Sequence, residues 1–181
     1  MLERRAREER RAAEDDYVRL ARRAVETIVR TGKLPPVPAE LPEEMAGRAG
    51  VYVMLTRDGT PRGTYGTFEP SAKSIADEIT RNAAPAARND THVAPVTEEE
   101  LDALDITVDV LSEPELVGGA EALDPKTYGI IAESRGRKGV MLPAAPGIET
   151  AEEQLRAARK KAGIPEDAAI RIWRFTSERH A

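Results

Sequence analysis

Apolar residues recur at every third or fourth position in the first part of the chain, and this spacing predicts one long helix over residues 3–30. The apolar stripe consists of Tyr17, Leu20, Ala21, Ala24, Val25 and Ile28. The first turns lack such a stripe and are charged almost all round, with opposite charges four residues apart, as at Arg10 and Glu14. Residues 1–13 are therefore expected to form a charged helical extension.

Alternating apolar and polar positions in the middle of the chain predict β-hairpins. Val51–Thr56 and Arg62–Phe68 are rich in β-favouring residues and flank Asp58-Gly59, a dipeptide that accepts the positive φ of a tight turn. Ile106–Leu111 alternates cleanly and predicts another strand. The remaining predicted strands are Ile130–Glu133, Val140–Leu142 and Ile170–Thr176.

Shorter helices are predicted between the strands. One begins near Ala72, and Pro85 is expected to end or bend it near Ala84, because proline removes a backbone donor. Two others begin at sequences with capping-box spacing, Thr97 with Glu100 and Thr150 with Glu153. Residues 33–50, which contain four prolines, and residues 113–129 are expected to be irregular.

Together these elements predict an α+β fold in which hairpins form an antiparallel sheet and helices pack on it. Strands joined by hairpins are antiparallel, which excludes a doubly wound parallel sheet. The length of 181 residues favours a single domain over residues 1–181, with room for a smaller second lobe.

The composition narrows the chemistry that is available. The chain has no cysteine and only two histidines, His92 and His180, so disulfides, thiolate nucleophiles and cysteine-ligated metals are excluded. We expect no metal site and no cofactor. No segment reaches the length of about 18 apolar residues that a transmembrane helix needs, and no secretory signal begins the chain, so a cytoplasmic location without membrane attachment is expected.

The net charge of −5 argues against a general nucleic-acid binder. The arginines of residues 1–13 leave one alternative open, contact with RNA or phosphate. Because acidic residues interleave these arginines, an ion-paired helix in solvent is the favoured interpretation.

Two glycines, Gly63 and Gly66, interrupt the second strand of the first hairpin. Glycine weakens a strand, and its usual reasons there are a bulge or the close approach of another backbone or a ligand. The guanidinium of Arg62 and the hydroxyls of Thr64 and Tyr65 beside these glycines suit an anion or a planar polar group. The alternative is a twisted strand packed tightly on a helix, with Arg62 in water.

Four later residues complete the predicted ligand-binding surface: Glu69, Asn82, Asp90 and His92. Asn82 is either a ligand group or a satisfied core amide, and Glu69 either caps the following helix or acts as an acid. Asp90 and His92 form either an acid–base pair or an Asx turn. The predicted concave surface is lined by Arg62, Thr64, Glu69 and Asn82, with Asp90 or His92 at its rim.

The order of these segments resembles the AMMECR domain family, whose signature is Leu-Arg-Gly-Cys-Ile-Gly on the second strand of a hairpin. The resemblance covers about residues 14–178. It rests on Gly50–Val53, Asp58-Gly59, Arg62–Gly66, Glu69-Pro70, Asn82–Ala84, Pro95–Leu101, Ile106–Leu111, Arg137–Pro143 and Ala162–Pro165.

The resemblance implies an α+β fold with an antiparallel sheet and a smaller lobe. It also implies the role of protein A in the AmmeMemoRadiSam system, beside a Memo-like, dioxygenase-related protein and a radical-SAM protein. It supplies no reaction.

The chain departs from the family pattern at chemically important positions. The signature cysteine is Thr64, and the isoleucine after it is Tyr65. The Asp-Pro-Arg-Phe of the family is Asp90-Thr91-His92-Val93, and Ala144 replaces the glutamine after Leu-Leu-Pro. A threonine hydroxyl needs an adjacent base to act as a nucleophile.

Two functional hypotheses follow. In the first, the chain is a ligand- or partner-binding accessory module that works with the Memo-like and radical-SAM proteins. In the second, it is an enzyme of unknown reaction that uses the Arg62–Gly66 cleft. The missing cysteine and the shortage of histidine favour the first.

The lack of cysteine and the separation of His92 and His180 lead to a prediction about metal content. Protein purified without chelators is expected to carry no stoichiometric transition metal, because the usual nitrogen and sulfur ligands are too few. Elemental analysis measures this directly, and one zinc or iron per chain would contradict it.

Overall fold

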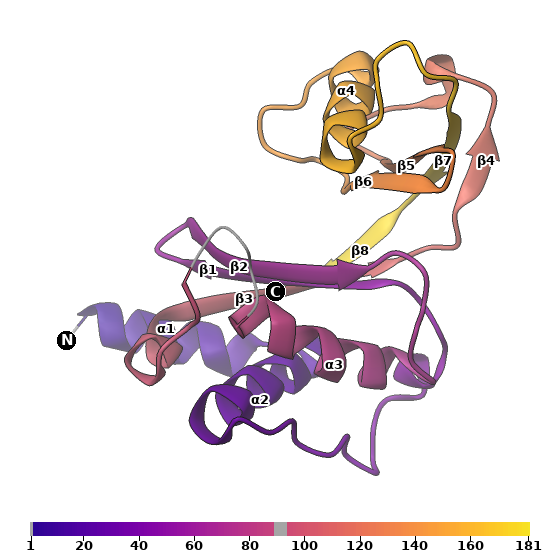
Figure 1. Ribbon diagram of the computed structural model, residues 1–181. Helices are drawn as coiled ribbons and strands as arrows, with labels where there is room; N and C mark the ends of the chain where they lie inside the picture. The colour runs from indigo at the N-terminus through magenta and orange to yellow at the C-terminus, as the bar shows by residue number, and fades with distance from the viewer. Residues whose placement is uncertain (1, 89–93) are drawn as a thin grey trace. The chain divides into compact units, whose positions relative to one another are not determined.

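The computed structural model describes residues 2–88 and 94–181, which divide into two compact units (Figure 1). The first unit is residues 1–110 with Arg179–Ala181, and the second is Leu111–Glu178. Both contain antiparallel sheets and helices, so the predicted α+β class is confirmed. Within the described residues, no helix has both the length and the apolar character needed to cross a membrane.

Strands of the first unit lie in the order β2-β1-β3-β8. Their bounds are β1 Val51–Arg57, β2 Thr60–Thr67, β3 Leu104–Leu111 and β8 Ser177–His180. The β1–β2 hairpin turns at Asp58 and Gly59, whose φ values are 50° and 75°, and its strands are antiparallel, as the sequence predicts. Strand β8 was missed by the sequence analysis, which ended its last strand at Thr176.

Three α-helices belong to this unit: α1 Leu2–Ala13, α2 Asp16–Thr31 and α3 Ile75–Arg88. The prediction of one helix over residues 3–30 is wrong, because the chain breaks between α1 and α2. Asp15 caps α2 by accepting a hydrogen bond from the Val18 N–H at 3.0 Å. Glu14 does not pair with Arg10; its carboxylate binds the buried guanidinium of Arg22.

Helix α3 also differs from its prediction. It begins at Ile75 and continues through Pro85 to Arg88. Ser74 accepts a hydrogen bond from the Asp77 N–H at 3.1 Å, so Ser74 caps the helix. A proline inside a helix is destabilising by about 3 kcal/mol. The helix persists because Ala86 and Ala87, beyond the predicted end, are buried.

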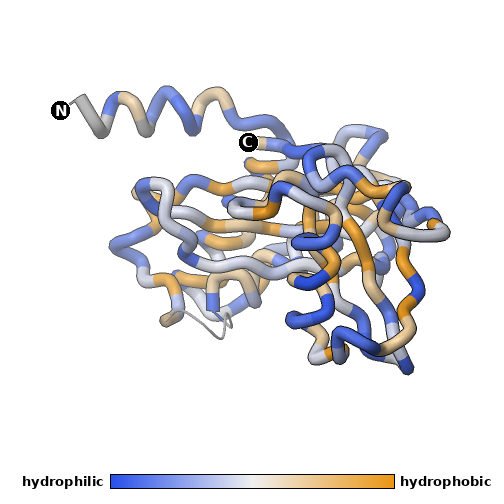
Figure 2. The backbone as a smooth tube through the Cα atoms, turned by 90° about the horizontal axis from the view of Figure 1, so that it is seen from above, coloured by the Kyte–Doolittle hydropathy of each residue, from blue (hydrophilic) through white to orange (hydrophobic). Residues whose placement is uncertain are grey.

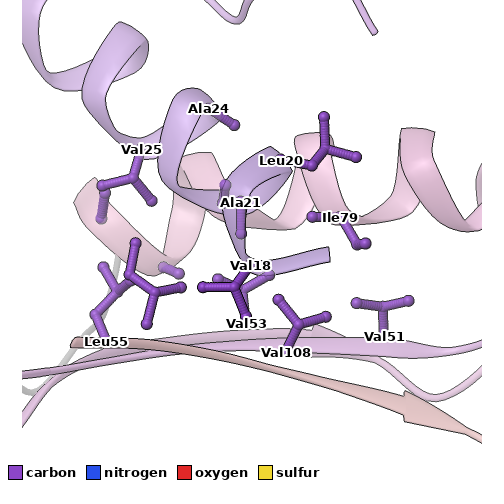
Figure 3. Packing of buried hydrophobic residues seen from close by; sticks show 14 of the residues in the cluster. Val18, Leu20, Ala21, Ala24, Val25, Val51, Val53, Leu55, Ile79 and Val108 are labelled. Carbon is purple, nitrogen blue, oxygen red and sulfur yellow. The ribbon is translucent and has the colours of Figure 1, made fainter. Parts of the chain in front are cut away.

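The core of the first unit lies between α2, α3 and one face of the sheet (Figure 3). Val18, Ala21 and Val25 of α2 and Ile79 of α3 point toward alternate residues of the strands. The strand residues are Val51, Val53, Leu55 and Val108, which have no solvent exposure. Burying each such side chain contributes about 1.5–3 kcal/mol, so this packing holds the hairpin on the two helices.

Two short 3₁₀-helices complete the first unit. The proline-rich connection contains η1 Glu43–Ala46, whose Met45 is buried in the core. The predicted capping box at Thr97 and Glu100 is confirmed, and it opens η2 Glu98–Ala103 rather than an α-helix.

Strands of the second unit lie in the order β4-β7-β5-β6. Their bounds are β4 Glu115–Val117, β5 Gly129–Ser134, β6 Arg137–Met141 and β7 Arg171–Phe175. The β5–β6 hairpin turns at Arg135 and Gly136, with φ values of 50° and 79°. Residues 113–129, predicted to be irregular, contain β4 and the 3₁₀-helix η3 Ala120–Ala122.

Helix α4 Ala151–Ala162 covers the second sheet. Its capping box at Thr150 and Glu153 and its end at Gly163, with φ 62°, match the sequence prediction. A Cβ at Gly139 of β6 would overlap the backbone carbonyl of Ala158 in this helix. Glycine at this position therefore lets strand and helix backbones meet directly.

The coloured parts of helix α1 are mostly hydrophilic (Figure 2). Near its end, Arg10 contacts Asp105 at 3.2 Å, and Arg11 donates to the backbone carbonyl of Leu101 at 2.9 Å and pairs with Glu26 at 3.3 Å. These contacts of Arg10 and Arg11 tie the last turn of α1 to the rest of the unit.

Deleting residues 2–9 is expected to change the free energy of unfolding by about 1 kcal/mol or less, because exposed ion pairs such as Arg5–Glu9 contribute little. Deleting residues 2–11 removes Arg10 and Arg11 as well and is expected to be more destabilising. Urea denaturation of the two truncated proteins measures the difference. Equal destabilisation by both deletions would contradict this assignment.

Candidate functional site

The glycine-containing strand β2 lies at the edge of the first sheet, next to β1. Gly63 pairs with Leu55 and faces α3. A Cβ at Gly63 would overlap the backbone carbonyl oxygen of Ala86, so no larger residue fits unless the helix moves. Of the reasons that the sequence left open for this glycine, the structure supports close approach of another backbone.

Gly66 lies on the face of the hairpin opposite to that of Gly63. It is the cross-strand partner of Tyr52, and a Cβ at Gly66 would overlap the Tyr52 ring. Burial of this ring, with a smaller effect from nearby Tyr65, raises the pKa of Tyr52 to about 12. Gly66 therefore provides the space in which an aromatic side chain lies across the strand.

The guanidinium of Arg62 binds groups of its own chain. Its Nε and Nη2 donate to the two carboxylate oxygens of Glu100 at 2.7 and 2.8 Å. Nη1 and Nη2 donate to the backbone carbonyls of Ala94 and Pro95 at 2.5 and 3.0 Å. The side chain is 16% exposed. Arg62 thus holds the residues that precede η2 against the edge strand. Its side chain is not in open water, and its N–H groups already bind the protein.

This pairing changes the acidity of Glu100. The hydrogen bond from Arg62 lowers the pKa of the Glu100 carboxyl to about 2, with further help from the Thr97 N–H and against the effect of burial. The same hydrogen bond raises the pKa of Arg62. Both groups therefore stay charged at neutral pH, and the bidentate geometry is the strong form of a guanidinium–carboxylate pair.

A second polar cluster lies under the residues that follow β2. The carboxylate of Glu78, which is 1% exposed, accepts hydrogen bonds from the hydroxyls of Thr67 and Ser71 at 2.5 and 2.8 Å and from the Ala72 N–H at 2.6 Å. Burial acts to raise the pKa of Glu78, but these hydrogen bonds together lower it. The charged carboxylate thereby anchors the connection between β2 and α3.

Asn82 belongs to this second cluster. Its Nδ2 donates to the Val51 carbonyl at 2.9 Å and to the Thr67 hydroxyl at 3.2 Å. Arg62 and Thr67 are five residues apart on β2, about 17 Å along an extended strand. The structure therefore places the contacts of Arg62 and Asn82 in separate clusters, and a concave surface shared by these two residues stays a prediction of the sequence.

The remaining predicted residues are distributed over different surfaces. Thr64 and Tyr65 are both exposed, on opposite faces of β2. Glu69 is exposed in the connection after the strand. Asp90 and His92 lie outside the described residues. Ligand binding by the predicted set stays a prediction of the sequence.

Glu100 and Glu78 organise this region, but the sequence analysis did not include them in the site. Glu100 was recognised only as part of a capping box. Glu78 had a visible signal, because it lies three and four residues from Ile75 and Asn82 on the buried face of α3. An acidic residue on an apolar helix face usually has a structural or chemical partner.

His180 of β8 forms a third polar contact in this unit. Its Nδ1 lies 2.6 Å from the Asp15 carboxylate, and its ring stacks on Tyr17 at 3.8 Å between centroids. Asp15 also caps α2, so the contact joins the end of the chain to the start of that helix. In the part of the chain that the structure describes, no three His, Cys, Asp or Glu side chains form a group that could hold a metal ion.

Comparison with known proteins gives consistent matches over most of the chain. A sequence model of the AMMECR1 family matches residues 18–180. A protein from Thermotoga maritima is 45% identical over 170 residues, which cover 92% of this chain and 98% of that protein. A longer protein from Clostridium acetobutylicum is 40% identical over 175 residues, which cover 96% of this chain but only 37% of that protein.

A crystal structure shows the same fold. The chain is similar to an uncharacterized protein from Pyrococcus horikoshii, with a TM-score of 0.81 and 32% sequence identity. The match covers 90% of this chain and 88% of that chain.

Replacing Arg62 by alanine is expected to lower the free energy of unfolding by about 2 kcal/mol at neutral pH, because it removes the bidentate partner of Glu100 in a largely buried position and leaves only the longer contact with Arg57 at 3.5 Å. This differs from the small effect expected of an exposed arginine. The pKa of Glu100 is lowered from an ordinary value of about 4.3, so its contribution is present above that pH and is lost as the pH falls toward about 2.

The Arg62→Ala protein should therefore lose less stability than the wild type between pH 5 and pH 2. Urea denaturation across this range measures both effects. Arg19→Ala is a matched control, because Arg19 pairs with Asp16 and both side chains are 57% exposed. Equal stability curves for wild type and Arg62→Ala would exclude the structural role of this pair.

Proposed function

The chain belongs to the AMMECR1 family, and we propose that it acts as a binding module that serves partner proteins through the surface of β2 around Thr64 and Tyr65. Tyr65 carries the proposal. It is a tyrosine with 44% exposure on an edge strand, where most large apolar side chains of the unit are buried. Tyrosine is enriched among the residues that dominate binding energy at protein interfaces.

The surroundings of Tyr65 support this role because they are rigid. On one side, the Gly63 backbone lies against the carbonyl of Ala86 in α3. On the other, Thr67 is held by Glu78 and Asn82. A surface that is already ordered loses little conformational entropy when a partner binds, which favours affinity.

The polar side chains of the region support binding over catalysis. Arg62, Glu78 and Asn82 all form hydrogen bonds with their own chain. Such groups position backbone and are not available to exchange protons or to grip a substrate. Thr64 replaces the cysteine of the family signature.

The Clostridium relative supplies a further argument. The matched segment covers 37% of that protein, so most of its length is other sequence joined covalently to the same kind of unit. Fusion raises the effective concentration of one unit at the other and is useful when the two work together. This fits a module whose task depends on a partner.

The resemblance to protein A of the AmmeMemoRadiSam system identifies the partners to test. We propose the Memo-like protein and the radical-SAM protein of the same organism. An edge strand such as β2 offers a partner both side chains and backbone groups.

Tyr65→Ala is expected to weaken binding to the purified Memo-like or radical-SAM protein about tenfold or more, because truncation of a central interface tyrosine typically costs more than 1 kcal/mol. Isothermal titration calorimetry measures the affinity, and thermal unfolding checks that the variant stays folded. Leu34→Ala is a matched control, since Leu34 is 40% exposed and lies outside β2. Wild-type affinity in the Tyr65→Ala protein, or no binding of either partner to the wild type, would refute the proposal.

A further inference from the structure

The second unit contains a groove between the β5–β6 turn and residues 164–171. Two hollows of about 570 and 540 Å³ share Ser134, Arg135, Ala168 and Ala169 in their linings, and we refer to them together as the groove. Each volume lies within the range of about 300–1,000 Å³ that is typical of small-molecule sites.

Basic side chains dominate the charge of this groove. Arg135 and Arg137 line it on the hairpin side. Arg171 lines the other hollow, but its guanidinium binds the Glu133 carboxylate at 2.7 Å. Arg137 donates one hydrogen bond to the Gly163 carbonyl at 2.6 Å and keeps further N–H groups. Among the residues that the structure describes, Arg135 has no hydrogen-bond or ion-pair partner.

The position of Arg135 is set by the turn. Arg135 and Gly136 have φ values of 50° and 79°, the geometry of a tight hairpin turn between β5 and β6. Because Arg135 lies in a tight turn between two paired strands, its backbone is fixed. The arginine is thus presented on a rigid turn that lines both hollows, and no ion pair with a described residue neutralises its charge.

The opposite wall is held in place without Arg135. Arg159 of α4 donates from its Nη1 to the carbonyls of Pro165 and Ala168 at 2.6 and 3.0 Å. Ile164 is buried and anchors the same segment. Changing Arg135 therefore removes a charge from the groove but leaves its walls supported.

The remaining lining groups differ in character along the groove. Asp167 contributes a carboxylate and Ser134 a hydroxyl, while Ile164, Pro165 and Ala168 contribute apolar surface. A carboxylate accepts hydrogen bonds from hydroxyl or amino groups, and a pair of guanidinium groups suits the oxygens of a phosphate. The groove thus combines a site for an anion with a site for donors.

We infer that this groove binds a small phosphorylated molecule that carries hydroxyl groups. Arg135 and Arg137 hold its phosphate, and Asp167 accepts hydrogen bonds from its hydroxyls. The carboxylate of Asp167 disfavours a simple polyanion such as a nucleic-acid backbone, because its charge would repel successive phosphates. This site is independent of the β2 surface and of the partner binding proposed for it.

The test uses the full-length protein and four probes: ribose 5-phosphate, inorganic phosphate, ribose and a single-stranded RNA of ten nucleotides. Calorimetric and NMR titrations at constant ionic strength measure each affinity. Ribose 5-phosphate is expected to bind more tightly than phosphate or ribose. Arg135→Ala should weaken its binding about tenfold or more, the range of a hydrogen bond to a charged group.

Two further variants separate the parts of the site. Asp167→Ala should remove the preference for ribose 5-phosphate over phosphate without weakening phosphate binding, because the carboxylate contacts the hydroxyls and repels the anion. Lys126→Ala is a control for net charge, since Lys126 is 72% exposed, pairs with Glu149 and does not line the groove. It should leave the affinity for every probe unchanged.

Three results would overturn the assignment. The first is no saturable binding of ribose 5-phosphate at millimolar concentrations. The second is an equal loss of affinity in Arg135→Ala and Lys126→Ala, which would show a general charge effect. The third is binding of the RNA about tenfold more tightly than ribose 5-phosphate, which would make the groove a nucleic-acid surface.

Discussion

Direct contact between the backbone of a strand and the backbone of a helix is the constraint on which the first unit depends. At Gly63 the edge strand meets the carbonyl of Ala86, and a side chain of any size would push α3 away from the sheet. That helix carries Ile79 of the core and the Glu78 and Asn82 side chains that anchor β2. The second unit repeats the device at Gly139 and Ala158. In both units a glycine in a hairpin strand brings a helix into close contact with the sheet.

Several charged side chains of this chain fix backbone segments that lie outside its apolar core. Arg62 binds two carbonyls before η2, Glu78 binds two N–H groups after β2, and Arg159 binds two carbonyls after α4. Only 4% of the residues are aromatic. Charge-assisted hydrogen bonds to the backbone are stronger than neutral ones, so they order loops that apolar packing cannot reach.

This use of charge separates structural from functional candidates. An arginine or carboxylate whose donors and acceptors are satisfied by the backbone holds the fold, as Arg62 and Glu78 do. Exposed groups that the backbone does not bind in this way are better candidates for recognition. Tyr65 on β2 and Arg135 on the β5–β6 turn both remain exposed on rigid elements, and for that reason they carry the two binding proposals.

The sequence by itself determined the elements whose chemistry is local: the turns at Asp58-Gly59 and Arg135-Gly136, the capping boxes, and the end of α4 at Gly163. Their geometry depends on neighbouring residues, so one segment is enough to specify it. The tertiary structure decided what depends on residues far apart in the chain. Asp15 begins a new helix and also binds His180, Pro85 stays within α3 because the alanines after it are buried, and Arg62 finds Glu100, 38 positions away. These contacts depend on how the sheet brings distant segments together, and no local pattern encodes that arrangement.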